Sequence, residues 1–122
     1  MSEKKNKNRI SYDVKRIIAH QLSMGKAAFL TVQEYVKMAN GNLSIAQLRR
    51  AFPKSVNGKY AVIHDASKNH SALEYPRTYG TIALSDGTHI LVTNQWYRMG
   101  EFENWSRFVR NAHRHGIEVV ES

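Results

Sequence analysis

The chain has 122 residues, of which 42% are hydrophobic, and it carries a formal net charge of +8. Chains of this length usually form one domain, and this apolar content is enough for an ordinary core. The sequence has no cysteine, which excludes disulfides and thiolate metal sites. It also has no apolar run long enough to span a bilayer and no signal-peptide core, so we expect a soluble cytoplasmic protein that does not insert in membranes.

The excess positive charge lies in the first half of the chain. Residues 1–58 carry eleven Lys or Arg against three acidic residues, whereas residues 59–122 carry seven of each sign. A basic surface confined to one part of a protein favours a polyanionic partner, and nucleic acid is the main candidate. The alternative is solubilising charge that is unevenly distributed.

Residues 1–9 contain no apolar residue after Met1, which predicts a disordered basic tail. The remainder, residues 10–122, is predicted to be a single α+β domain with a helical half (10–58) and a sheet half (59–122).

Two helices are predicted in the first part of the helical half. The first covers residues 11–25, because apolar residues recur there at helical spacing: Val14, Ile17, Ile18 and Leu22. The second begins at Thr31, where Thr31 and Glu34 have the spacing of a capping box, and it ends at the Asn-Gly pair of residues 40–41.

The third predicted helix begins after Ser44 and ends at Pro53. Ser44 is a favoured N-cap residue, and Gln47 has the spacing that completes a capping box with it. Leu43 and Leu48 occupy the positions of a hydrophobic staple. Pro53 cannot donate the N–H that a continuing helix requires.

The sheet half is predicted to have the order β-β-β-α-β. A strand is expected over 59–63, an irregular loop over 64–78, a tight hairpin over 81–92, a helix over 101–115 and a last strand over 117–120. The hairpin turn is placed at Asp86-Gly87, with Ser85 opposite Thr88. This register puts four residues on one face: Ile82, Leu84, His89 and Leu91. The helix is expected to bury five: Phe102, Trp105, Phe108, Val109 and Ala112.

The resulting fold is three helices followed by a small sheet. Residues 31–53 resemble a helix-turn-helix, because two capped helices are joined by a short turn, and the hairpin follows where a late wing would stand. The third helix is then the predicted reader of DNA. Its outward side chains are predicted to be Ser44, Gln47, Arg49, Arg50 and Lys54.

Glutamine pairs with adenine and arginine with guanine, so Gln47 and Arg50 are the predicted base-contacting residues. The tail and the first helix are predicted to hold phosphates through Lys4, Lys5, Lys7, Arg9, Lys15 and Arg16. An ordinary solvated helix face is the alternative interpretation.

Three other patterns are interpreted as structural. The stripe Arg107, Arg110 and Arg114 has acidic neighbours in the sequence, which are expected to neutralise it. The aromatic residues Trp96, Tyr97 and Trp105 are expected in the core. The six histidines lack metal-ligand spacing, and no nucleophile motif or phosphate loop is present.

We therefore expect a small non-enzymatic protein without cofactor or metal that binds duplex DNA in preference to RNA. The sheet half would support the fold or contact a protein partner, for example in a homodimer. One alternative is a small basic nuclease or toxin that uses His64, Asp65 and His70. The other is a protein-interaction module, such as an inhibitor of a nucleic-acid-handling enzyme.

Overall fold

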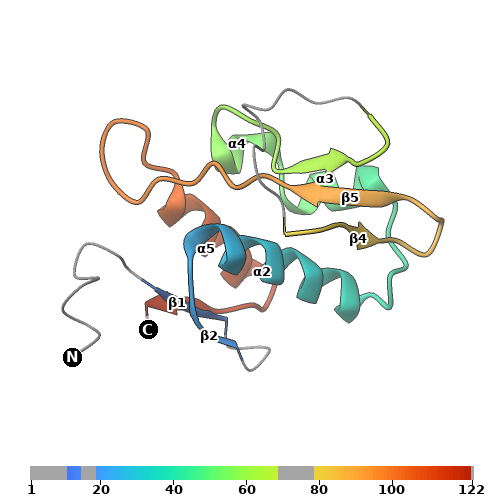
Figure 1. Ribbon diagram of the computed structural model, residues 1–122, viewed down its shortest axis with the longest axis horizontal. Helices are drawn as coiled ribbons and strands as arrows, with labels where there is room; N and C mark the ends of the chain where they lie inside the picture. Colours follow the sequence, from blue (N-terminus) through green and yellow to red (C-terminus); the bar gives the residue numbers. More distant parts are fainter. Residues whose placement is uncertain (1–10, 15–18, 69–78, 122) are drawn as a thin grey trace.

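The computed structural model describes residues 11–14, 19–68 and 79–121. Within them the chain forms two antiparallel three-stranded sheets and four helices (Figure 1). In chain order the elements are β1 (Tyr12–Val14), β2 (Ala19–Leu22), α2 (Met24–Met38), α3 (Ile45–Ala51), α4 (Lys54–Asn57), β3 (Ile63–Asp65), β4 (Ile82–Ala83), β5 (His89–Val92), α5 (Trp105–Arg114) and β6 (Val119–Glu121).

The sheet orders are β2-β1-β6 and β3-β5-β4, and α2 packs against strands of both sheets. In Figure 1, α2 crosses the middle of the molecule between them. The helix α5 packs against α2, α4 and β6, and α3 packs against β3. Among the described residues, no helix combines the length and the apolar character needed to cross a membrane.

The fold is a mixed α+β fold, but the predicted order of three helices followed by β-β-β-α-β is wrong. The segment predicted as the first helix contains the antiparallel strands β1 and β2. Tyr12 and Val14 are both buried, which is the period of a strand, and aromatic and β-branched residues favour strands. The other partner of β1 is β6, from the opposite end of the chain. With strands in place of its first helix, the predicted succession of three helices over residues 11–53 is wrong.

The predicted start of the second helix at Thr31 is also wrong. The helix α2 begins after Ser23, whose side chain accepts a hydrogen bond from the Lys26 N–H. Thr31 is an interior residue, fully buried, and its hydroxyl donates to the Ala27 carbonyl at 2.8 Å. The predicted end is correct, because Asn40 and Gly41 both have positive φ angles, 55° and 75°.

The third helix is confirmed as α3. The Ser44 side chain accepts from the Gln47 N–H at 3.1 Å, and the Gln47 amide oxygen accepts from the Ser44 N–H at 2.8 Å. Leu48, the predicted staple residue, is buried, and so is Phe52. The predicted strand over 59–63 is wrong, because the short helix α4 follows Pro53 and β3 begins only at residue 63.

The hairpin β4–β5 is confirmed, but its predicted register is wrong by one residue. Ile82 lies opposite Ile90, and the Leu84 N–H donates to the Thr88 carbonyl. The turn therefore has three residues, and Gly87 takes the left-handed position with a φ of 91°. A shift of one residue exchanges the two faces of a strand pair. The core face consists of Ile82, Leu84, Ile90 and Val92, whereas Ala83 and His89 are exposed.

The last helix begins at Trp105 rather than at residue 101. Trp105, Phe108 and Ala112 are buried as predicted, but Phe102 lies outside the helix and is 65% exposed. Trp96 and Trp105 are confirmed as core residues, with ring centres 5.9 Å apart. The placement of Tyr97 in the core is wrong, because it is exposed. The predicted last strand overlaps β6.

Candidate nucleic-acid interface

The side of α5 that faces α3 is fixed by two polar side chains. Asn111 is buried, and its amide donates to the Ala51 carbonyl at 2.8 Å. The His115 Nε2 atom lies 3.0 Å from the same oxygen, a contact in which the ring nitrogen donates. Ala51 is the last residue of α3, where carbonyls lack partners within the helix. The two side chains therefore cap α3 and fix its position against α5.

Arg107 connects α5 to α4 in the same way. Its Nε donates to the Val56 carbonyl at 3.2 Å, and its Nη2 donates to the Asn57 carbonyl at 3.0 Å. These are carbonyls at the C-terminal end of α4. Arg107 is therefore a structural residue, as the sequence interpretation of the arginine stripe expected, although its partners are carbonyls rather than acids.

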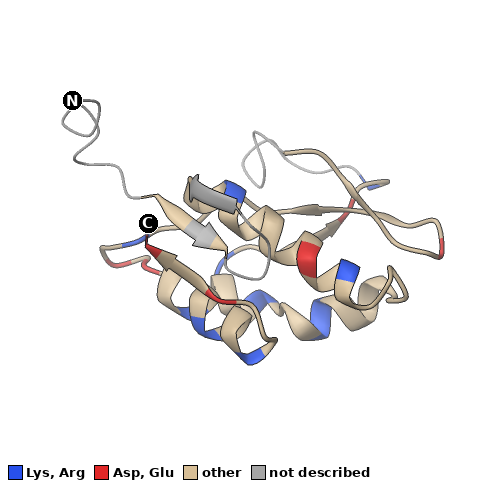
Figure 2. Cartoon of the chain, turned by 90° about the horizontal axis from the view of Figure 1, so that it is seen from below, with Lys and Arg blue, Asp and Glu red and all other residues tan. Residues whose placement is uncertain are grey.

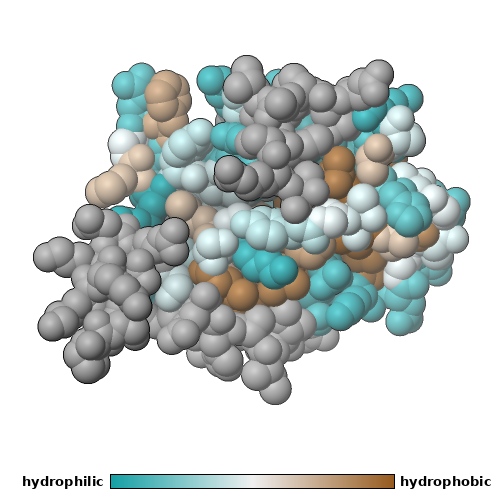
Figure 3. Space-filling view, in the orientation of Figure 1, coloured by the Kyte–Doolittle hydropathy of each residue, from teal (hydrophilic) through white to brown (hydrophobic). Residues whose placement is uncertain are grey.

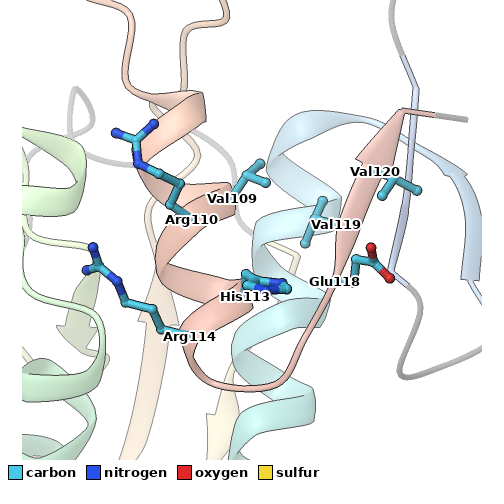
Figure 4. A pocket seen from close by; sticks show the side chains of 7 residues that line it. All are labelled: Val109, Arg110, His113, Arg114, Glu118, Val119 and Val120. Atoms are coloured by element: carbon cyan, nitrogen blue, oxygen red, sulfur yellow. The ribbon is translucent and has the colours of Figure 1, made fainter.

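Arg110 and Arg114 behave differently from Arg107. Both are exposed, and Figure 4 shows them extending from α5 on the side where α3 and α4 lie. The neighbouring acid Glu118 lines the same pocket as Arg110 and Arg114, and it lies on the β6 side of that pocket. In Figure 4 the Glu118 carboxylate points away from the two guanidinium groups.

The α3 side of the surface carries Arg50 and Lys54, both exposed as predicted. Gln47 is exposed as well, but its amide oxygen is engaged in the capping box. The Arg49 Nε–H donates a hydrogen bond to the Ile63 carbonyl at 3.3 Å. Ser44 uses its hydroxyl as the N-cap. Among the five residues predicted for this surface, all of which the structure describes, Arg50 and Lys54 are the two that take no part in these internal hydrogen bonds.

We define the cationic face as Arg50, Lys54, Arg110 and Arg114. Figure 2 shows the Lys and Arg positions of α3, α4 and α5 along the same side of the molecule. Residues 35–64 and 104–117 contain no Asp or Glu, so the helices that form this face have no acidic residue of their own. The helices of this face therefore contribute positive charge alone, and the acids nearest to α5 in the sequence, Glu103 and Glu118, flank its two ends. An excess of positive charge is the electrostatic condition for attracting a polyanion.

Glu103 is the carboxylate that borders the face at the start of α5. The Ser106 N–H donates to it at 2.8 Å and the Ser106 hydroxyl at 3.0 Å. The Ser106 N–H holds the pKa of Glu103 below its usual range, and the charges of Arg107 and Arg110 act in the same direction. This carboxylate therefore interacts with the N-terminus of α5, where a negative charge is favourable.

A pocket of about 420 Å³ lies between side chains of α5 and β6. Val109, Val119 and Val120 give it an apolar lining, and His113 lies beside them (Figure 4). Arg110 and Arg114 form its border with the cationic face. Within the residues that the structure describes, no three His, Asp or Glu side chains are grouped so that they could hold a metal ion.

Of the residues of the predicted nuclease site, His64 and Asp65 lie in the part of the chain that the structure describes. His64 is 4% exposed on β3. The Asp65 carboxylate accepts hydrogen bonds from the N–H and hydroxyl of Ser67, which lower its pKa. His70 lies outside the described residues. The same is true of the predicted phosphate-contacting residues Lys4, Lys5, Lys7, Arg9, Lys15 and Arg16.

Arg110 and Arg114 are the residues of the cationic face that the sequence interpretation named but assigned a structural role. The signal that could have found them is their spacing of four within a stretch without acids, which places both on one helix face. Comparisons with protein family models, with curated proteins and with solved structures found no match to this chain. The functional argument therefore depends on the geometry of the cationic face.

Proposed function

We propose that the protein binds duplex DNA through the cationic face. The observation that carries the proposal is the convergence of exposed Lys and Arg side chains from α3, α4 and α5, helices without acidic residues, on one side of the molecule. A small anion is bound by a few convergent groups in a cavity. The pocket beside Arg110 and Arg114 has an apolar lining, whereas the four cations are spread over three helices. Such an extended face suits an extended polyanion, and the regular phosphates of a duplex are such a ligand.

The proposed binding mode uses mainly phosphate contacts. Direct base reading by Gln47 would require its amide oxygen to leave the Ser44 N–H. Arg50 is then the remaining α3 side chain that could reach a guanine edge. Contacts to phosphate fix the position of a protein on DNA but carry no sequence information. We therefore expect weak sequence preference and strong salt dependence.

A binding role without catalysis is part of the proposal, and so is a cytoplasmic location, which the lack of cysteine favours. The nuclease alternative receives less support, since His64 is buried and is not exposed to a substrate on the surface. A protein partner for the cationic face would have to be strongly acidic, and the following experiment separates it from DNA.

The test is the affinity for a labelled duplex, measured by fluorescence anisotropy from 50 to 200 mM salt. The four phosphate contacts of this face contribute about −3.6 to the salt slope, and this contribution by itself lowers the wild-type affinity roughly 150-fold over this range. The variant Arg50→Gln/Lys54→Gln/Arg110→Gln/Arg114→Gln should bind more weakly and lose most of that slope. All four side chains are exposed, so the variant should remain folded.

A matched control removes two positive charges outside the cationic face and is compared with a variant that removes two charges from it. Lys37 and Lys68 are exposed, on α2 and after β3, outside the cationic face. The variant Lys37→Gln/Lys68→Gln should keep nearly the wild-type slope, whereas Arg110→Gln/Arg114→Gln should lose about half of it. Equal effects of the two double variants would contradict a specific face, and absence of DNA binding by the wild type would refute the proposal.

A further inference from the structure

Residues 97–103 form a loop that exposes large apolar side chains. Met99 is 68% exposed and Phe102 is 65% exposed, and Tyr97 is 46% exposed. Figure 1 shows this loop at the upper left, beside α4, and Figure 3 shows hydrophobic residues at the surface in the same region. Several exposed apolar side chains on one short segment favour an interaction site rather than a chance surface.

The loop is held at its base by a buried side chain. Asn104 is 2% exposed; its amide oxygen accepts from the Tyr97 N–H at 2.7 Å, and its amide nitrogen donates to the Asn57 and Gln95 carbonyls, each at 3.2 Å. The Trp105 N–H donates to the Tyr97 carbonyl. Both ends of the loop are therefore joined to each other and to the end of α4, so the loop presents Phe102 at a defined place.

A cation lies beside the Phe102 ring. The Lys59 Nζ atom is 5.9 Å from the centre of that ring and 5.5 Å from the centre of the Tyr60 ring. Lys59 follows Gly58, which is the C-cap residue of α4. Gly58 in turn lies close to the Arg107 side chain of α5. The group Lys59, Tyr60 and Phe102 therefore adjoins the helices that carry the cationic face.

We propose that Tyr60 and Phe102, with Lys59, form a stacking site for an unpaired base at the end of the bound duplex. This inference rests on the proposed DNA binding and adds the class of DNA: a duplex with a single-stranded extension. Aromatic rings stack on any base, and a neighbouring cation can contact the phosphate of the same nucleotide.

The test compares three labelled duplexes: blunt-ended, with a short single-stranded overhang, and with the same overhang lacking its bases. Wild-type protein should bind the overhang duplex about 5- to 150-fold more tightly than the blunt duplex for each stacked base, and the abasic overhang should give no such gain. The variant Phe102→Ala should lose the gain and keep the affinity for blunt duplex. Phe102→Trp should retain it.

Met99→Ala is the matched control, because it truncates an exposed side chain of the same loop that is not part of the group Lys59, Tyr60 and Phe102. It should behave as wild type. Equal wild-type affinity for blunt and overhang duplexes would overturn this inference and leave the proposed DNA binding standing, as would an equal loss of both affinities in Phe102→Ala. Absence of binding to every duplex would overturn both.

Discussion

Arg107 and Arg110 are three residues apart on α5, yet the structure gives them different roles. Arg107 donates to three backbone carbonyls, those of Val56 at 3.2 Å, Asn57 at 3.0 Å and Glu103 at 3.4 Å. Arg110 is exposed and belongs to the cationic face. The substitution of each by glutamine removes one charge from the same helix, so the pair separates a stabilising role from a binding role.

The cost of Arg107→Gln follows from these contacts. Hydrogen bonds to charged groups contribute about 1.5–3 kcal/mol. The contact to Glu103 is long, and the Asn57 carbonyl keeps the Asn104 amide as a partner at 3.2 Å, so the main loss is the bond to Val56. We expect the free energy of unfolding to fall by about 2 kcal/mol in Arg107→Gln and to stay within about 0.5 kcal/mol of wild type in Arg110→Gln.

The assay is urea denaturation of both variants, followed by duplex affinity over a range of salt concentrations. Arg110→Gln should reduce the salt slope by about 0.9, the loss of one phosphate contact. Arg107→Gln should leave that slope nearly unchanged under conditions in which it is folded. Equal stability of the two variants, or a larger loss in Arg110→Gln, would refute this division of roles.

Three further predictions test other parts of the account. Leu48→Ala should lower the free energy of unfolding by about 2–5 kcal/mol, because Leu48 is fully buried; an unchanged thermal melt would show that the α3 side-chain phase is wrong. Gly87→Ala should cost about 1–2 kcal/mol in the same melt, because its φ of 91° is unfavourable for a residue with a Cβ, and no cost would contradict the three-residue turn. Deletion of residues 1–9 should weaken binding to all DNA sequences alike and flatten the salt slope, and an unchanged slope would remove the tail from the mechanism.

The sequence predicts α3 well because everything that specifies this helix is local. Ser44 and Gln47 satisfy each other's backbone groups, and Pro53 ends the helix a few residues later. The strand β1 is different, because its neighbours are β2 and the distant β6. Helical spacing of apolar residues and strand pairing compete in such a segment, and tertiary contacts decide between them. A single sequence contains no direct record of those contacts.

The residues of the cationic face also fall into two groups, those that follow from local sequence and those that depend on tertiary contacts. Arg50 and Lys54 follow from the local phase of α3, whereas Arg110 and Arg114 depend on how α5 lies against α3 and α4. That arrangement is set by buried polar contacts such as Asn111 to Ala51, sixty residues apart in the chain. The exposure of Phe102 likewise depends on the tertiary contacts of Asn104. Local reasoning places both residues in one helix, and the hydrogen bonds of Asn104 exclude Phe102 from it.

The most direct test of the cationic face is an NMR titration of isotopically labelled protein with duplex DNA. The account predicts that the largest chemical-shift changes occur at the backbone amides and side chains of Arg50, Lys54, Arg110 and Arg114. It also predicts small chemical-shift changes at the exposed residues of the β4–β5 turn, which lies outside the cationic face. Changes concentrated outside α3, α4 and α5, or no changes at all with folded protein, would contradict the central claim.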